Sequence, residues 1–216
     1  MTRGLWALAS LASLALGILG CTPSDQCGDA PDGAVCVTVH LTGAIDVDAH
    51  ITSLQVDSQF TNGNVTSGAA RTRRRLVTPQ DTDAGTPSLP IAFAVIFESP
   101  AVIDESSRII VLARDGVTAV GVGSAQPTTD FTPLKPNTHL QVNLALSPAK
   151  DNPCFDMVKA TGNTTDLNCG GPNCPACGIG QKCNGNTDCG DLTRTLSCQS
   201  VSGSGLLCSA VPPPEP

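Results

Sequence analysis

An alternation of aliphatic and polar residues runs through the middle of the chain. In the segment 35–41, Val35, Val37, Val39 and Leu41 alternate with Cys36, Thr38 and His40. Because successive residues of a strand point to opposite faces, this period of two predicts a strand with one apolar face. Similar or nearly continuous apolar runs, and one weaker basic segment, predict about seven strands, at 35–41, 54–60, 72–78, 91–97, 109–113, 117–122 and 140–146.

Residues that favour turns separate these predicted strands, and a helical period is nowhere sustained. Asp115-Gly116, between two apolar runs, is a two-residue hairpin signal, because glycine tolerates a positive φ. Short strands at regular spacing are typical of sandwiches. The sequence therefore predicts a mainly β chain, with an immunoglobulin-like antiparallel β-sandwich over residues 35–148.

The composition changes after Pro148. Residues 154–208 contain eight cysteines and only scattered large apolar residues. So thin a core does not easily offset the chain entropy of a small domain, and disulfides are the expected source of order. We predict a small, disulfide-rich, loop-dominated module at 149–210, a proline-rich tail at 211–216, and a polar tether at 21–34 that precedes the sandwich.

The first twenty residues have the pattern of an export signal. A single basic residue, Arg3, precedes an apolar run from Leu5 to Leu19. As a helix these 15 residues reach about 22 Å, less than the roughly 30 Å of a bilayer core. We therefore predict a signal peptide at 1–20 and no membrane-spanning helix.

The end of this segment, Ile18-Leu19-Gly20-Cys21, resembles the lipobox of bacterial lipoproteins. The resemblance implies cleavage before Cys21, a diacylglycerol on its thiol and an acyl group on its new amine. This covalent lipid is the one cofactor-like group expected, and it makes a membrane the expected partner. Thr22, where the family places Asp for inner-membrane retention, implies the outer membrane. Ordinary cleavage after Gly17, which would release a secreted protein, is the alternative.

Cysteine parity agrees with a lipid on Cys21. The chain has eleven cysteines, and removing Cys21 leaves ten, an even number suited to a compartment where disulfides persist. The disulfide candidates are Cys27, Cys36, Cys154, Cys169, Cys174, Cys177, Cys183, Cys189, Cys198 and Cys208. Cys27 and Cys36 are spaced to close a small loop. The eight cysteines of the module allow 105 pairings, among which the sequence does not choose.

Two stretches resemble parts of exported myxobacterial proteins. Leu112-Ala-Arg-Asp-Gly116, Gly121-Val-Gly-Ser-Ala125 and Pro136-Asn-Thr138 resemble pieces of β-sandwich repeats in myxobacterial lipoproteins. Cys169-Gly-Gly-Pro-Asn-Cys174-Pro-Ala-Cys177 resembles a CGGxxCxxC motif of secreted and lipid-anchored myxobacterial proteins, although the gap from Cys189 to Cys198 is longer than usual there. The resemblance implies a sandwich and an envelope location, and carries no catalytic motif.

The polar and cysteine motifs also bear on other chemistry. Cys169, Cys174 and Cys177 have the C-x4-C-x2-C spacing of plant-type ferredoxins, and zinc binding or a Cys174/Cys177 dithiol are further interpretations of the same cluster. A redox-active or metal-binding envelope lipoprotein that uses the C-terminal cysteine cluster is therefore the alternative function. Asn184, Asn186 and Asp188 imitate the start of a calcium loop, but Cys189 replaces its glycine, which favours an Asx-stabilised turn. The basic segment 71–75 is interpreted as a solvated strand or loop, with lipid phosphate or an acidic polysaccharide as the alternative partner.

Charge and composition narrow the function. A net charge of -7, no tyrosine and five phenylalanines argue against nucleic acid, which needs a basic face and aromatic stacking. The three histidines are far apart, and no G-x-S-x-G or H-E-x-x-H motif occurs. We therefore expect a lipid-anchored cell-envelope protein that acts as a binding or structural module, without catalysis or a metal. The ligand class stays open between protein and polysaccharide.

Overall fold

The computed structural model describes residues 27, 30–62, 70–77, 89–97, 101–102, 107–126, 139–155, 166, 168–171 and 173–211. Within these ranges, no helix has the length and apolar character needed to cross a bilayer. The predicted signal peptide, Cys21, most of the tether and the end of the proline-rich tail lie outside the described residues.

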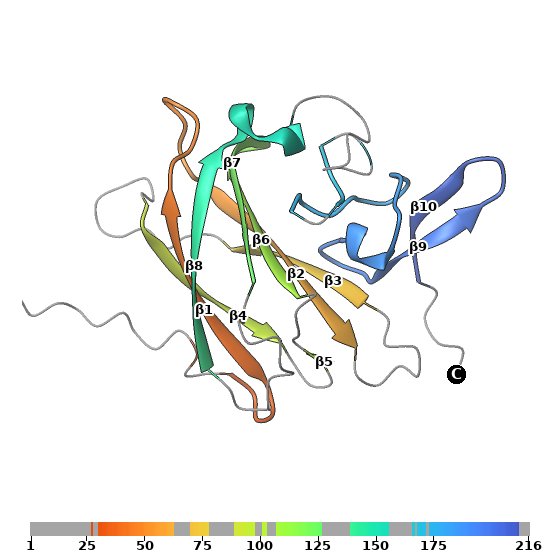
Figure 1. Cartoon of the computed structure of the whole chain (residues 1–216), viewed down its shortest axis with the longest axis horizontal. Coiled ribbons are helices and arrows are strands. Elements are labelled where there is room, and N and C mark those ends of the chain that lie inside the picture. The colour runs from red at the N-terminus through yellow and green to blue at the C-terminus, as the bar shows by residue number, and fades with distance from the viewer. Residues whose placement is uncertain are drawn as a thin grey trace, which may run out of the picture.

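The seven strands predicted from the sequence are all present, and together they form one curled sheet (Figure 1). They are β1 (Val35–Gly43), β2 (Ser53–Asn62), β3 (Ala70–Val77), β4 (Ile91–Phe97), β6 (Arg108–Asp115), β7 (Thr118–Ala125) and β8 (His139–Pro148). A short additional strand, β5 (Ala101–Val102), pairs with β2. Because β5 has only two residues, it shows no alternation of apolar and polar positions by which the sequence could predict it.

The strand order is β3-β2-β6-β7-β8-β1-β4. The strands β4, β1 and β8 form one layer, and β3, β2, β6 and β7 form the other. Only two residue pairs, Gly121 with Pro148 and Val122 with Ser147, join the described parts of the layers at the β7–β8 corner. The predicted sandwich is confirmed. Adjacent strands in the sheet run antiparallel, except β1 and β8, which are parallel. Parallel strands need a long connection, and β1 and β8 are far apart in the sequence.

The core lies between the two layers and consists of the apolar faces that the alternation predicted. Its fully buried members include Val37, Val39, Leu41, Leu54, Val56, Ile109, Val111 and Leu144. Phe60 and Phe97 close one part of it with an edge-to-face contact at a centroid distance of 6.1 Å. Burial of one such side chain stabilises the folded state by about 1.5 to 3 kcal/mol. The sandwich is therefore held together largely by its aliphatic residues.

Strand β6 is buried on both faces. Ile109 and Val111 face the core, whereas Ile110 and Leu112 pack with Val122 in a second apolar cluster outside the sandwich. Phe155, which follows β8, packs against this outer cluster. The continuous apolar run that predicted β6 therefore reflects two separate apolar contacts, one on each side of the strand.

Glycines shape β7 at its turn and at its contact with β8. The β6–β7 hairpin turns at Gly116 and Val117, one residue later than the Asp115-Gly116 signal, and Gly116 has a φ of +58°. A Cβ atom on Gly123 would lie 2.4 Å from the carbonyl oxygen of Ala145. The stretch Gly121-Val-Gly-Ser-Ala125 is thus part of a closely packed strand.

The cysteine-rich module, residues 149–210, contains three short 3-10 turns and a hairpin in its described part. The turns are η1 (Ala149–Asp151), η2 (Pro153–Phe155) and η3 (Asn186–Asp188), and the hairpin pairs β9 (Leu196–Val201) with β10 (Gly205–Ala210). The module lies beside β2 and β3 (Figure 1). Its loop-dominated character is confirmed, and the hairpin is an addition that its short apolar runs did not predict.

Candidate functional site: a cleft between the sandwich and the cysteine-rich module

The ten candidate cysteines form five disulfides in the structure. The pairs are Cys27–Cys36, Cys154–Cys174, Cys169–Cys177, Cys183–Cys198 and Cys189–Cys208. The first ties the segment before β1 to that strand, and the other four lie in the module. Five disulfides indicate an extracytoplasmic protein, because thiols are kept reduced in most cytosols. The predicted lipid carrier, Cys21, lies outside the described residues.

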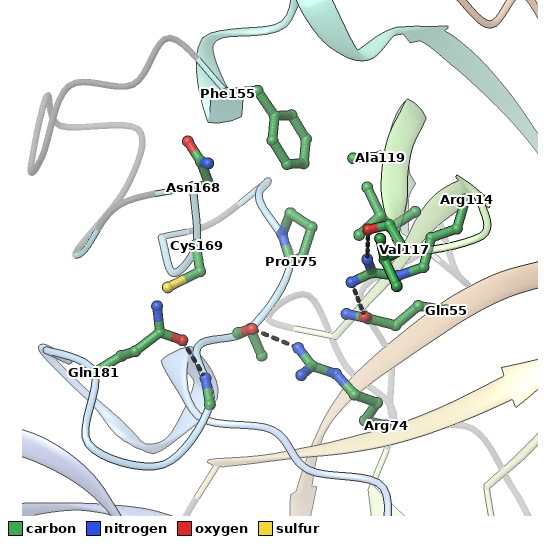
Figure 2. Close-up of a pocket in the computed structure, with 13 residues that line it drawn as sticks. Gln55, Arg74, Arg114, Val117, Ala119, Phe155, Asn168, Cys169, Pro175 and Gln181 are labelled. Carbon is green, nitrogen blue, oxygen red and sulfur yellow. Dashed lines mark hydrogen bonds between the residues drawn. The ribbon is translucent and has the colours of Figure 1, made fainter. Parts of the chain in front are cut away.

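A cleft of about 510 Å³ separates the module from the outer face of β2, β6 and β7 (Figure 2). Leu112 and Ala119 form an apolar floor on the sandwich side, and Phe155 and Pro175 form a wall on the module side. Val117, in the β6–β7 turn, is 91% exposed and lies at the rim. The polar lining comprises Gln55, Arg74, Arg114, Asn168 and Gln181, with Cys169, Ala176 and Gly178 completing the surface.

Arg114, near the end of β6, brings a positive charge into this cleft. Its Nη2 donates to Oε1 of Gln55 at 2.8 Å, and its Nη1 donates to the carbonyl oxygen of Val117 at 3.0 Å. Both acceptors are neutral. Burial lowers the pKa of Arg114, the neighbouring charge of Arg74 lowers it further, and Asp57 acts in the opposite direction.

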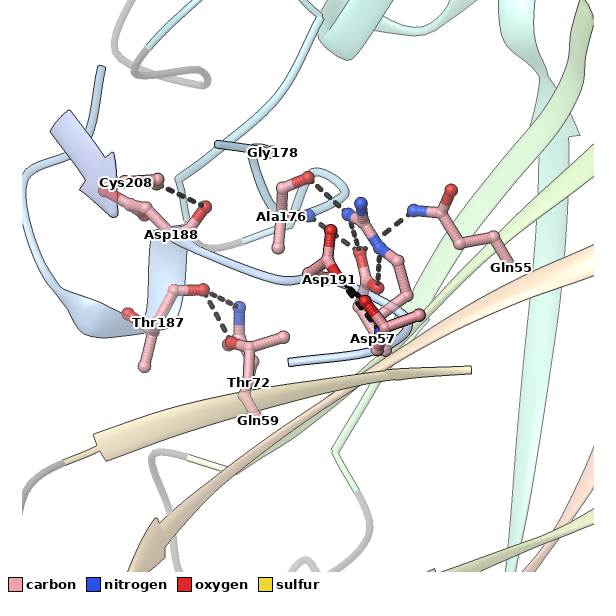
Figure 3. Close-up of polar contacts among 12 residues, drawn as sticks. Gln55, Asp57, Gln59, Thr72, Ala176, Gly178, Thr187, Asp188, Asp191 and Cys208 are labelled. Atoms are coloured by element: carbon pink, nitrogen blue, oxygen red, sulfur yellow. Dashed lines mark hydrogen bonds and ion pairs between the residues drawn. The ribbon is translucent and has the colours of Figure 1, made fainter. Parts of the chain in front are cut away.

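The charge of Arg74, on β3, is already matched inside the protein. Its Nε and Nη2 donate to the two carboxylate oxygens of Asp57 at 2.7 and 2.9 Å, a bidentate ion pair (Figure 3). The two residues are direct cross-strand partners in the β2–β3 register. The Asp57 side chain is 1% exposed. Arg74 is therefore a partly buried ion-pair partner, which corrects the interpretation of the segment as solvated at this residue, whereas Arg73 is exposed.

The same ion pair holds the module on the sandwich. Oδ2 of Asp57 accepts a hydrogen bond from the backbone N–H of Ala176 at 2.8 Å, and Nη2 of Arg74 donates to the carbonyl oxygen of that residue. Nearby, the carbonyl oxygen of Thr187 accepts from Oγ1 of Thr72 at 2.7 Å and from Nε2 of Gln59 at 3.3 Å (Figure 3). These contacts, together with a hydrogen bond of 3.3 Å between Ser124 on β7 and Asn173, attach the described part of the module, and with it the cleft wall, to the sandwich.

The polar face of β2 is buried because the module covers it. Gln55, Asp57 and Gln59 alternate with core residues and so lie on the outer side of the strand, yet their exposed fractions are 5%, 1% and 4%.

Arg75, the next residue of the basic segment after Arg74, links the two layers of the sandwich. It donates a hydrogen bond to the carbonyl oxygen of Ala94 on β4. Burial, and then the charge of Arg73, lower the pKa of Arg75.

Disulfides and side-chain contacts hold the module wall of the cleft. Cys154, beside Phe155, is bonded to Cys174, beside Pro175, so the apolar wall is covalently linked. Cys169, itself a lining residue, is bonded to Cys177. Oε1 of Gln181 accepts from the backbone N–H of Gly178 at 2.7 Å (Figure 2). The wall therefore owes its shape to covalent bonds more than to an apolar core.

The cysteines with ferredoxin-like spacing do not gather as one ligand set. Cys169 and Cys177 are bonded to each other, whereas Cys174 is bonded to Cys154. A different trio lies together, since the sulfur atoms of Cys183, Cys189 and Cys208 are all within 4.8 Å of one another and buried. Each of these sulfurs is in a disulfide and would need reduction before it could bind a metal as a thiolate.

The motif that imitates a calcium loop directs its oxygen atoms to backbone groups. Oδ1 and Oδ2 of Asp188 accept from the backbone N–H groups of Gly171 and Asn184 at 2.9 and 2.7 Å. Oδ1 of Asn186 accepts from the N–H of Cys198 at 2.9 Å. Of these contacts, the one between Asn184 and Asp188 lies within the predicted turn, and the other two join the turn to separate loops of the module. Asp188 is 6% exposed.

Sequence reasoning missed the residues that build the cleft. The sequence pattern places Asp57 on the polar face of a predicted strand and Arg74 in the basic segment. Arg114 lies in the stretch Leu112-Ala-Arg-Asp-Gly116 that resembles the myxobacterial repeats. The one signal in the sequence that could have pointed to these residues is Asp57 itself. Acidic residues are depleted in the middle of strands, and a carboxylate that is buried there requires a partner.

Comparison with protein-family models, curated proteins and solved structures finds no match to this chain.

Proposed function

We propose that this protein is an extracytoplasmic, non-catalytic binding protein whose ligand enters the cleft between the sandwich and the module. The observation that carries the proposal is the cleft itself. Its volume of about 510 Å³ lies within the roughly 300 to 1,000 Å³ of small-molecule sites, and it places an apolar floor beside five polar or charged side chains.

The lining argues for binding over catalysis. Among the described residues that line the cleft, none is Asp, Glu, His, Ser or Lys, and the cysteine is in a disulfide. Nucleophilic and general acid–base catalysis depend on such groups. We further propose that a lipid on Cys21 holds the protein at the outer membrane, which the Ile18-Leu19-Gly20-Cys21 box supports. That lipid is the only attached group we propose.

A screen of small molecules by ligand-observed NMR tests the proposed site. Ala119→Trp fills the floor of the cleft, and Thr118→Trp places the same bulk on the adjacent exposed residue outside it. We expect compounds that bind the wild-type chain and Thr118→Trp to lose binding to Ala119→Trp. Equal binding to both variants would remove the cleft as the ligand site.

A second candidate function, metal or redox chemistry, is favoured by the sulfur trio of Cys183, Cys189 and Cys208. Zinc binds thiolates at about 2.3 Å, so this function requires reduced cysteines. Counting free thiols and bound metal on protein purified without reductant separates the two functions. Ten oxidised cysteines and no zinc agree with the binding protein, whereas zinc together with free thiols would replace it with the second function.

A further inference from the structure

We propose that the ligand of the cleft is a small organic acid whose single carboxylate pairs with Arg114 and whose apolar part packs against Leu112 and Phe155. This inference rests on the proposed function, since it names the ligand class for that same cleft. It follows from the distribution of charge, burial and apolar surface around Arg114.

Among the described residues around the cleft, Arg74 and Arg114 share the single carboxylate of Asp57, so one positive charge is left in excess. Arg74 is neutralised by the bidentate pair with Asp57, and both carboxylate oxygens of Asp57 are engaged with Arg74, Gln55 and Ala176. The hydrogen bonds of Arg114 go to neutral oxygens. Within the part of the chain that the structure describes, no carboxylate lies at ion-pair distance from its guanidinium.

The guanidinium group favours a carboxylate as the missing partner. Its planar, forked donors match the two oxygens of a carboxylate, and desolvation by the cleft walls increases the gain from such a pair. A single uncompensated charge matches a monoanion. A dianion would bring a second negative charge close to Asp57, the buried carboxylate of the neighbouring pair.

The remaining surface selects for an apolar group next to that carboxylate. Ala119 on the sandwich side lies across the cleft from Phe155 and Pro175 on the module side (Figure 2), and Leu112 lines the same cleft in one apolar cluster with Ala119 and Phe155. Val117, which is 91% exposed, adds an apolar residue at the rim beside Arg114. A ligand that spans from Arg114 to Phe155 therefore needs an acidic end and an apolar body.

Calorimetric titration of the full chain with three matched probes tests this class of ligand. The probes are 3-phenylpropionate, the uncharged 3-phenylpropanol with the same ring, and acetate with the same charge. We expect the wild type to bind 3-phenylpropionate more tightly than either other probe. Arg114→Gln should weaken 3-phenylpropionate about 10- to 100-fold and leave 3-phenylpropanol unchanged, because a hydrogen bond to a charged group is lost.

Two controls keep the result interpretable. Arg194→Gln removes an arginine whose side chain is 57% exposed and which does not line the cleft, and it should leave binding unchanged. Arg114→Lys should retain part of the affinity. Equal binding of 3-phenylpropanol and 3-phenylpropionate, or an Arg114→Gln variant with full affinity for the acid, would overturn the ligand class and leave the cleft as a binding site. No binding of 3-phenylpropionate would also overturn it, and the Ala119→Trp screen would then decide the proposed function separately.

Discussion

The buried carboxylate of Asp57 on β2 accepts a hydrogen bond of 2.8 Å from the backbone N–H of Ala176, a residue 119 positions farther along the chain. The contact joins the sandwich to a module that has little apolar core of its own. Because Arg74 binds both Asp57 and the carbonyl oxygen of Ala176, this ion pair is one of the contacts that set the position of the cleft wall. Stability of the docked module and the shape of the cleft are therefore linked.

Replacing Asp57 should destabilise the protein strongly. Asp57→Ala leaves the guanidinium of Arg74 buried without its counter-charge and the N–H of Ala176 without its acceptor. Loss of one partner from a buried pair costs about 3 to 5 kcal/mol. Arg194→Ala is the matched control, because its pair with Asp191 spans 4.0 Å at an exposed site, where such pairs contribute about 0 to 1 kcal/mol. Urea unfolding with intact disulfides measures both. Equal losses for the two variants would mean that Asp57 does not stabilise the docked module.

Adding one methyl group at Gly123 should be far more costly than the same change at Gly185. The new Cβ at Gly123 would lie 2.4 Å from the carbonyl oxygen of Ala145 and 2.7 Å from a methyl carbon of Leu144, where β7 crosses β8. Overpacking of this kind costs about 1 to 3 kcal/mol or more. A Cβ on Gly185 would meet no described atom within 4 Å beyond its chain neighbours, and its φ of -161° is extended. Gly185→Ala should therefore stay within about 1 kcal/mol of wild type. Thermal or urea unfolding of the two variants measures the loss in the free energy of unfolding. Comparable losses for Gly123→Ala and Gly185→Ala would contradict the close contact between β7 and β8.

Replacing Cys21 should prevent attachment of lipid. Cys21→Ala removes the thiol that the lipobox resemblance identifies as the acceptor, so metabolic labelling with radioactive fatty acid should disappear and the protein should leave the detergent phase. Cys27→Ala is the control, because it breaks the Cys27–Cys36 disulfide but keeps the lipobox. It should remain labelled. Fatty acid that still enters the Cys21→Ala variant would remove the lipoprotein proposal.

The sequence predicted the strands and missed the site, for one physical reason. Alternation is local, so the segments that became β1, β2 and β4 were recognisable from about seven residues each. Contacts between Asp57 and Ala176, or between Cys154 and Cys174, depend on how distant segments fold back together. Four bridges among eight cysteines admit 105 pairings, and local pattern does not rank them. The hairpin β9–β10 was missed because cysteine, serine and glutamine interrupt its apolar pattern.

Reduction should release the module and abolish the cleft while the sandwich survives. The module has four disulfides and a small cluster formed mainly by cysteines, so their loss should exceed the roughly 5 to 15 kcal/mol by which most domains are stable. The sandwich has one disulfide, Cys27–Cys36, and an apolar core of its own. The β2 face that the module covers is polar at Gln55, Asp57 and Gln59, so its exposure to water should be tolerated. We expect limited proteolysis after reduction to cut beyond residue 150 and leave a fragment that begins near Val35, with β-type circular dichroism retained. Alkylation without reduction serves as the control and should leave the chain intact. A module that resists protease without its disulfides, and becomes sensitive only when a chelator is added, would show that the cysteines hold a metal.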